Sequence, residues 1–199
     1  SNQIRGVFGG GRTPSTVNTI DYITIAQTGN AVDFGDLTQV TQWPGGCSNS
    51  IRGLWFGGNN YPTYYNTISY IEIATTGNAA DFGDLAQAAQ VKAGASSATR
   101  GLMYGGQIPS SPSDINTIEF ITFTSTGVVT DFGDGTATRR GAAGMSDSIR
   151  AVYASGYDAP GETSMMDFVQ IASTGDAVDF GDATDSGFSA GTSNGHGGL

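Results

Sequence analysis

A segment of about 48 residues recurs four times in this chain of 199 residues. Its two best-matched copies, 18–39 and 66–87, read NTIDYITIAQTGNAVDFGDLTQ and NTISYIEIATTGNAADFGDLAQ, and 17 of their 22 positions are identical. The phenylalanine of the DFGD tetrapeptide recurs at intervals of 48, 50 and 48 residues, at Phe34, Phe82, Phe132 and Phe180. Self-similarity at this period indicates a repeat architecture in which no single unit buries its apolar face alone.

Four short segments recur within each period and are predicted to be β-strands. They are a run of small residues, a segment that begins with arginine, a segment rich in β-branched and aromatic residues, and DFGD. In the third segment Ile20 and Tyr22 point to one face and Ile23 and Ile25 to the other, a pattern typical of a strand buried on both faces. No window has sustained helical periodicity, so the expected fold is all-β with four short antiparallel strands per repeat.

A period near 48 residues with four short strands is typical of a propeller blade. The strand that ends in a Gly-Gly doublet resembles the kelch repeat, with doublets at Gly9-Gly10, Gly57-Gly58 and Gly105-Gly106. The kelch aromatic pair of the last two strands is replaced here by Thr-Gly and DFGD. The resemblance implies a small four-bladed kelch-like β-propeller.

The expected organisation is a single repeat domain that spans residues 1–199. Gly191 lies 47 residues beyond Gly144, so the last residues align with the small-residue strand. We expect them to pair beside the N-terminal strand and complete the first blade, since this removes an open sheet edge. The alternative is a linear stack, or a partial ring completed by oligomerisation. The predicted repeats are 1–44, 45–92, 93–141 and 142–190, with 191–199 as the closing strand.

The sequence pattern RGxFGG…NTIxYITIAxTGNAxDFGDL also resembles repeats of virion structural and tail-fibre proteins of marine tailed phages, cyanophages especially. This resemblance covers nearly the whole chain. It implies a virion or extracellular location, and partners that are other virion proteins in an oligomeric assembly.

Composition excludes several classes of partner. The net charge of −10 argues against nucleic acid, whose binding depends on basic residues that neutralise phosphates. Only 13% of residues are charged, about half the usual share, and Cys47 is the single cysteine, so no intramolecular disulfide is expected. No apolar run approaches the roughly 20 residues that span a bilayer.

The aspartates of DFGD have two interpretations. Oxygen ligands such as Asn30, Asp33 and Asp36 suit calcium, although calcium loops place more carboxylates closer together. The favoured interpretation is structural: one aspartate caps the turn and the phenylalanine fills the space between blades. No cofactor is therefore expected. The aspartates at these repeat positions are Asp33, Asp36, Asp81, Asp84, Asp131, Asp134, Asp179 and Asp182.

One arginine also recurs in each copy at a single repeat position, and these four arginines match the repeated aspartates in number. We expect a ring of Arg–Asp contacts that joins strands or blades, while Arg139 is expected to be exposed. The repeated arginines are Arg5, Arg52, Arg100 and Arg150.

No catalytic residue is predicted, and the chain is expected not to be an enzyme. His196 is the only histidine, and it lies in a glycine-rich tail. A hydrolytic triad, a histidine metal site or a phosphate-binding loop needs residues that the sequence lacks. Repeat-equivalent aspartates have similar environments, whereas a catalytic carboxylate pair needs two different ones.

The loops that follow the glycine doublets differ between repeats and are the candidate binding face. Exposed aromatic and amide side chains suit either a subunit contact, which is favoured, or stacking against a sugar. The leading function is therefore a virion structural protein of a tail, fibre or capsid surface. The alternative is a lectin-like adhesion module for a host glycan or receptor. The candidate binding residues are Trp55, Asn59, Asn60, Tyr61, Tyr64 and Tyr65.

Overall fold

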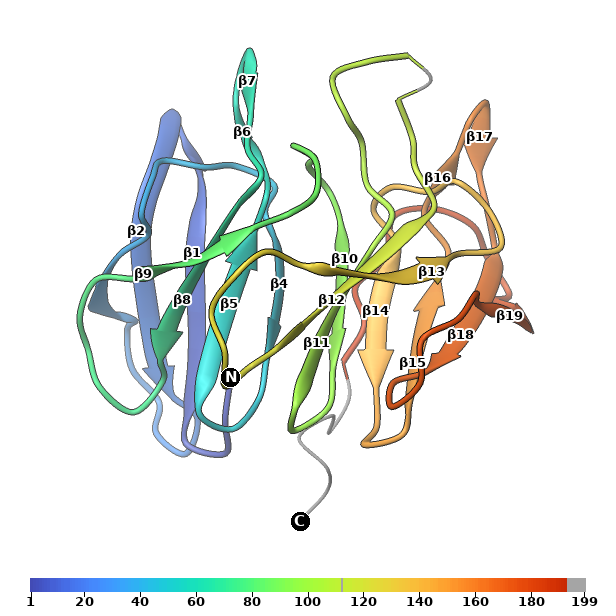
Figure 1. Cartoon of the computed structure of the whole chain (residues 1–199). Coiled ribbons are helices and arrows are strands. Elements are labelled where there is room, and N and C mark those ends of the chain that lie inside the picture. The colour runs from blue at the N-terminus through green and yellow to red at the C-terminus, as the bar shows by residue number, and fades with distance from the viewer. Residues whose placement is uncertain (112, 193–199) are drawn as a thin grey trace.

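The computed structural model describes residues 1–111 and 113–192, and this part of the chain is all-β. Its strands form antiparallel sheets, arranged in chain order around the molecule in Figure 1. Among the described residues, no helix has the length and hydropathy that a membrane span needs.

Four sheets contain most of the strands, and each is formed by one stretch of the chain. The first sheet has the order β1 (Arg5–Thr13), β2 (Ser15–Thr24) and β3 (Val32–Asp36). The second has the order β4 (Gly45–Ser48), β5 (Arg52–Phe56), β8 (Thr67–Glu72) and β9 (Ala80–Asp84). The third has the order β10 (Ala93–Ser96), β11 (Arg100–Tyr104), β12 (Thr117–Thr122) and β13 (Thr130–Asp134). The fourth has the order β14 (Ala143–Ser146), β15 (Arg150–Ala154), β18 (Met165–Gln170) and β19 (Val178–Asp182).

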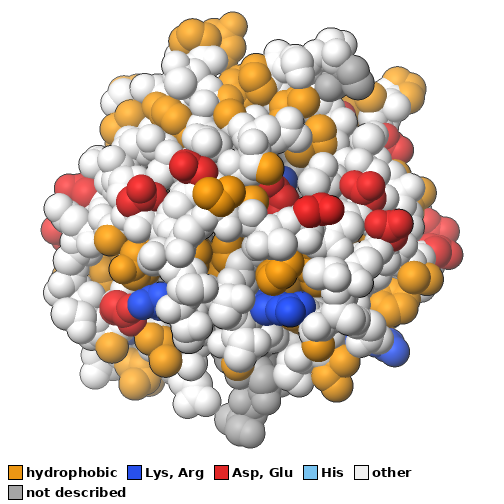
Figure 2. Space-filling model, in the orientation of Figure 1, with side chains coloured by type: hydrophobic (Ala, Val, Ile, Leu, Met, Phe, Trp, Pro, Cys, Tyr) orange, Lys and Arg blue, Asp and Glu red, His pale blue; other side chains and the backbone are white. Residues whose placement is uncertain are grey.

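Two small hairpins extend from one end of these sheets, which we call the loop end. One pairs β6 (Asn59–Asn60) with β7 (Thr63–Tyr64), and the other pairs β16 (Tyr157–Asp158) with β17 (Gly161–Glu162). The loop end is uppermost in Figure 1. On the face shown in Figure 2, hydrophobic side chains are scattered from the loop end to the opposite end, and acidic side chains form a band across the middle.

DFGD forms a β-bulge between the last two strands of each sheet. In the second sheet Gly83 pairs with Ile68. The next pair joins Asp81 to Ser69, so Phe82 has no partner in the ladder. A bulge re-aims the extra residue, and the ring of Phe82 lies edge-on to an aromatic ring of β8, with centroids 5.7 Å apart. The other three sheets have the same register shift.

The structural interpretation of DFGD agrees with these contacts. The Asp81 carboxylate accepts a hydrogen bond from the backbone N–H of Gly83 at 3.0 Å, and Asp179 does the same for Gly181 at 3.1 Å. The first aspartate thus caps the turn in these two copies. The phenylalanine is buried between sheets in three copies, with at most 3% of Phe34, Phe82 and Phe132 exposed.

Each DFGD segment also holds the next sheet through its backbone. The carbonyl of Phe82 accepts a hydrogen bond from Gly127 at 2.7 Å, and that of Asp84 accepts one from Val129 at 3.1 Å. A Cβ on Gly83 would lie only 2.0 Å from the Gly127 carbonyl oxygen, and its φ of +145° disfavours other residues. The first and second sheets, and the third and fourth, have equivalent contacts.

The hydrophobic core is divided among the spaces between sheets. One cluster lies between the first and second sheets, one between the second and third, and one between the third and fourth. The residue after each third strand closes its cluster, and Ile73, Phe123 and Ile171 are at most 2% exposed. Burial on both strand faces explains why the third segments are apolar on both sides.

The repeated arginines do not pair with the aspartates of DFGD, so that expectation is wrong. Each guanidinium lies 4.7–5.0 Å from the centre of an aromatic ring on the strand that pairs with the DFGD strand of its own sheet. Arg5 and Arg100 donate to the carbonyls of Ile73 and Ile171 in the next sheet, at 2.9 and 2.8 Å. Arg52 donates to the carbonyl of Phe123. A backbone carbonyl is available there because the third strand has ended.

The small-residue strands β4, β10 and β14 lie side by side, and close backbone packing requires their glycines. A Cβ on Gly94 would lie 2.0 Å from the carbonyl oxygen of Gly46, and one on Gly144 would lie 2.1 Å from that of Gly94. Gly191 continues the series, since its Cβ would lie 2.9 Å from the carbonyl oxygen of Gly144. Any larger side chain would force these strands apart.

Serine hydroxyls connect the same strands further along. Ser96 Oγ donates to the carbonyl of Ser48, and Ser146 Oγ donates to the carbonyl of Ser96, both at 2.7 Å. Ser48 Oγ in turn donates to the carbonyl of Ser1 at 3.2 Å. Ser1 therefore occupies, beside the second sheet, the place that Ser48 and Ser96 occupy beside the sheets that follow them.

The first and fourth sheets each leave one face uncovered among the described residues. Phe8 is 58% exposed, whereas the repeat-equivalent Met103 is fully buried. Ile25 is 55% exposed, although its equivalents are buried. On the fourth sheet Phe180 is 50% exposed, in contrast to the other three DFGD phenylalanines. Arg150 is exposed too, and within the described residues it donates to no carbonyl of a neighbouring sheet.

The predicted closing strand at 191–199 falls mainly outside the described residues, as does His196. Gly191 and Thr192 are described and belong to no strand. Within the described part of the chain the first sheet accordingly has three strands where the next three have four.

Replacing Arg100 by alanine is expected to lower the free energy of unfolding by about 1–3 kcal/mol, because the variant loses both the ring contact and the bond to the Ile171 carbonyl. Urea unfolding of the two proteins measures the difference. Arg12→Ala is the control, since Arg12 is exposed and bonds only to the nearby Pro14 carbonyl. Equal midpoints for the two variants would contradict a structural role for Arg100.

Candidate ligand-binding site

The six predicted binding residues do not converge on one surface. Trp55 packs between the first two sheets, where a Cβ on Gly9 would lie 2.9 Å from its ring. Asn59 is buried, and Asn60 and Tyr61 are exposed, with 79% of Tyr61 accessible. The remaining pair, Tyr64 and Tyr65, is half-buried. Of the six, only Tyr61 projects fully from the loop end, and Asn59 and Tyr64 enter a side-chain network instead.

That network is a chain of carboxamides that runs across the loop end. Gln42 Nε2 donates to Asn59 Oδ1 at 2.8 Å, and Asn59 Nδ2 donates to Gln90 Oε1. Gln90 Nε2 donates to Gln107 Oε1 at 2.6 Å and to the Tyr64 hydroxyl at 3.4 Å. Every bond runs in the same direction, so the dipoles reinforce one another. The chain ends at the amide nitrogen of Gln107.

A cavity of about 420 Å³ opens beside the last two amides of this chain. Its walls are mostly apolar and come from linkers that enter the small-residue strands of three sheets. Gln90 and Gln107 supply carboxamides, and Arg140 supplies the charged group. The apolar wall consists of Trp43, Val91 and Phe188. Concave apolar pockets with a few convergent polar groups are the usual form of small-molecule sites.

The wall residues occupy one repeat position, just before the small-residue strand. Trp43 and Val91 have φ values of +54° and +56°, which non-glycine residues rarely adopt, and Gly141 has +65°. The backbone is held there by two hydrogen bonds of 3.0 Å, from Val91 to the Trp43 carbonyl and from Gly141 to the Val91 carbonyl. Phe188 lies over Gly141, where a Cβ would come within 2.1 Å of its ring. Strain of this kind is concentrated at functional sites.

Arg140 brings no free positive charge to the cavity. Its Nη1 donates to both carboxylate oxygens of Asp114, at 2.6 and 2.9 Å. Its guanidinium also lies 4.1 Å from the centre of the Tyr157 ring. The cavity therefore combines aromatic walls, an amide donor and a neutralised ion pair.

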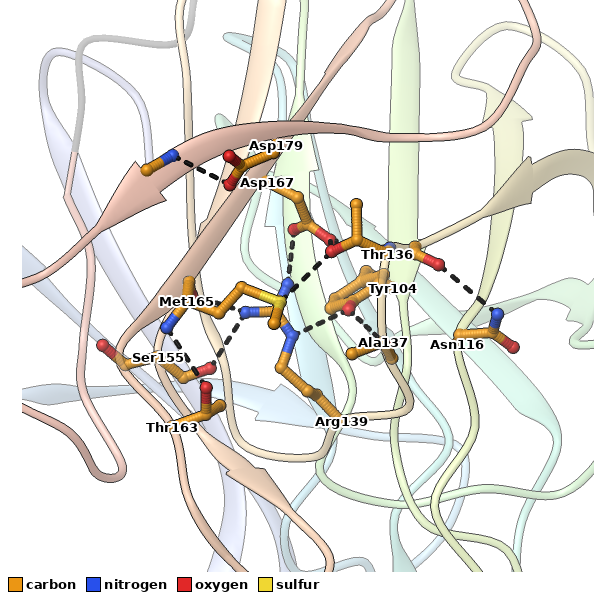
Figure 3. A network of polar contacts seen from close by, with 12 residues as sticks. Tyr104, Asn116, Thr136, Ala137, Arg139, Ser155, Thr163, Met165, Asp167 and Asp179 are labelled. Carbon is orange, nitrogen blue, oxygen red and sulfur yellow. Dashed lines mark hydrogen bonds and ion pairs between the residues drawn. The ribbon is translucent and has the colours of Figure 1, made fainter.

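A second cluster of ionisable groups is enclosed between the third and fourth sheets, as Figure 3 shows. Arg139 and Asp167 are fully buried and form an ion pair at 2.5 Å. Arg139 Nε also donates to the Tyr104 hydroxyl at 2.9 Å, and Thr136 donates to Asp167 through both its backbone N–H and its hydroxyl. The expectation of an exposed Arg139 is wrong, because β18 places the buried carboxylate of Asp167 at its side.

The second and third sheets are joined by a similar pair. Lys92 Nζ lies 3.1 Å from Glu119 Oε2, with both side chains at most 3% exposed. Burial lowers the pKa of Lys92, and the Glu119 charge opposes that shift. Glu119 and Asp167 hold repeat-equivalent positions on β12 and β18. A buried ion is costly unless it is paired. Both carboxylates are paired with a buried cation, so we assign the two ion pairs to sheet packing rather than to ligand binding.

The aspartates of DFGD are exposed; Asp81 and Asp179 make the turn contacts described above, and Asp182 accepts a hydrogen bond from the Ser164 hydroxyl at 3.3 Å. In residues 1–111 and 113–192 no group of three or more His, Cys, Asp or Glu side chains is placed to hold a metal ion. The calcium alternative is thus without a described ligand cluster.

No protein-family model matches the chain, and no curated protein sequence matches it either.

Sequence reasoning missed the cavity, although a signal for it is present. Trp43, Val91, Gly141 and Phe188 hold one repeat position, and they differ more in size than the residues around them. The loops after the glycine doublets also vary in sequence, and the binding residues were predicted there instead. What the sequence could not reveal is that the variable position lies beside an amide chain built from three repeats.

Trp43→Gly is expected to be more stable than Trp43→Ala by about 1 kcal/mol, because both remove the indole but only glycine relieves the left-handed backbone. Thermal unfolding of the two variants measures the difference.

The same two substitutions at Trp55 provide the control. Trp55 lies in the extended strand β5, where glycine is expected to be the less stable of the two. A Trp43→Ala variant that is at least as stable as Trp43→Gly would contradict the strained backbone at residue 43.

Proposed function

We propose that this chain is a non-enzymatic structural protein of a virion, built as a four-bladed kelch-like β-propeller that acts through protein–protein contacts. In this proposal the four sheets are the blades, and the face of the fourth that is uncovered among the described residues would pack against that of the first. The expected closing strand at 191–199 lies mainly outside the described residues, which include only its Gly191 and Thr192.

The observation that carries the propeller is a cavity of about 260 Å³ to which all four repeats contribute. Its lining comes from β4, β10 and β14, together with Ser1, Gly191 and Thr192. Inner strands of a propeller surround a central axis in this way. Ser1 and Gly191 each continue the backbone series of the inner strands from opposite ends, as the hydroxyl bond from Ser48 and the close approach to Gly144 indicate.

The two uncovered faces are also complementary. Neighbouring sheets contact each other in three places, and the same repeat positions form each contact. In each contact one sheet uses the face with its DFGD phenylalanine, and the next sheet uses its opposite face. The first sheet has one side free, with Phe8 and Ile25, and the fourth sheet has the other side free, with Phe180. Closure would bury these side chains and bring Arg150 to a carbonyl, as in the three contacts already formed.

The structural role rests on the loop end. Residues that recur in each repeat form the contacts between sheets, whereas the β6–β7 and β16–β17 hairpins project and differ in sequence. Tyr61 at the tip of the first hairpin is 79% exposed, and exposed tyrosine is typical of protein interfaces. The resemblance of the repeat wording to phage virion proteins supplies the biological context, with other virion proteins as partners.

Phe180→Asp is expected to lower the free energy of unfolding by about 3–5 kcal/mol, as Phe82→Asp would, because closure buries both rings. Urea unfolding combined with light scattering measures stability and mass together. A monomeric Phe180→Asp protein with wild-type stability would contradict the closed ring. Stability that rises with protein concentration would instead assign the two faces to neighbouring copies.

The virion role predicts a genomic setting: reading frames beside this one encode tail and capsid proteins. It also predicts that the purified protein binds to isolated particles of the corresponding phage and co-sediments with them. Neighbouring genes of metabolism, or a protein that stays in the supernatant, would contradict the role and leave the fold untouched.

A further inference from the structure

We infer that the cavity between Trp43 and Phe188 is a binding site for a neutral sugar ring. This site is separate from the tyrosine hairpin and does not depend on the virion role. It uses only residues of the described chain, and its walls do not require the ring to be closed.

The aromatic walls are exposed and held in place. Trp43 and Phe188 are each 59% exposed, so both rings remain accessible to a ligand. The positive φ of Trp43 fixes the direction in which its side chain leaves the backbone. Phe188 rests on the bare backbone of Gly141, where a side chain would displace it. Rigid aromatic faces with apolar area suit the C–H face of a pyranose.

The polar side of the cavity offers a hydrogen-bond donor. Gln107 Oε1 is occupied by the donated bond from Gln90, which leaves the Gln107 amide hydrogens at the end of the chain. A carboxamide nitrogen has two donors, and the aligned bonds from Gln42 onward strengthen them. No described residue accepts a bond from Gln107 Nε2. A ligand hydroxyl or ring oxygen is the matching acceptor.

The charge of the cavity indicates a neutral ligand. Among the described residues that line it, Arg140 is the one charged residue, and Asp114 already engages it through both carboxylate oxygens. An anionic ligand would have to compete with that carboxylate. The volume of about 420 Å³ lies near the lower end of the range for small-molecule sites, which suits a small saccharide.

The test is titration calorimetry of the full chain with methyl glycosides of glucose, galactose, mannose and N-acetylglucosamine, after a glycan array for breadth. Saturable binding of a neutral sugar is expected. Trp43→Gly removes the indole and relieves the left-handed backbone, and it is expected to weaken sugar binding at least about tenfold. Gln107→Glu replaces the donor by an acceptor and is expected to weaken it also. Val128→Ala, a substitution at an exposed turn, is the matched control and leaves the dissociation constant unchanged.

Three results would overturn the inference. The first is the absence of binding to any neutral glycan on the array. The second is binding that Trp43→Gly leaves unchanged or that only acidic glycans show. The third is binding that Tyr61→Ala abolishes while Trp43→Gly does not, which would assign the site to the β6–β7 hairpin. The co-sedimentation experiment reports on the virion role separately, so the two proposals fail independently.

Discussion

The rest of this structure depends on one contact between neighbouring sheets. The bulged DFGD segment of one sheet presents its phenylalanine, the bare Cα of its glycine and two carbonyls to the Thr-Gly turn of the next. The repeated arginine joins the same two sheets by stacking on its own sheet and donating to the next. Backbone N–H and C=O groups between the sheets are thereby hydrogen-bonded beside the buried apolar side chains, as buried backbone groups require.

Because the repeated residues form the contact between sheets, other positions are free to differ between repeats. The position before each small-residue strand holds Trp43, Val91, Gly141 or Phe188, and none of these side chains belongs to the hydrophobic clusters between sheets. The backbone there favours glycine, so tryptophan and valine are retained at a cost of roughly 1–2 kcal/mol each. A strained and exposed aromatic residue beside an open cavity is a pattern that function explains better than folding stability does.

The buried ion pairs add differences between contacts that are otherwise alike. Glu119 and Asp167 hold corresponding positions and pair with Lys92 and Arg139, which come from different positions of the linkers, while Ser69 takes the acidic position in the second sheet and bonds to Thr38. Removing one partner of such a pair costs about 3–5 kcal/mol because the other is left buried and unpaired. Each pair therefore fixes the linker that enters a sheet to the third strand of that sheet.

Sequence reasoning recovered the features that depend on local order. The alternation in the third segments and the glycine-rich turns predict short antiparallel strands, and the turn-capping aspartate follows from a side chain that reaches its own backbone two residues on. Partners across sheets were predicted less well. The arginines were expected to meet aspartates, and Arg139 was expected in solvent, because a repeat pattern shows which positions are equivalent but not which of them face each other.

The sequence by itself determined the repeat, the strand class and the small residues of β4, β10 and β14, since period and side-chain volume are properties of the chain. Only the tertiary structure decided the partners of the arginines, the burial of Arg139 and the cavity beside Trp43. These depend on contacts between residues 17 to 71 positions apart along the chain, which only strand pairing and the packing of neighbouring sheets bring within a few ångströms.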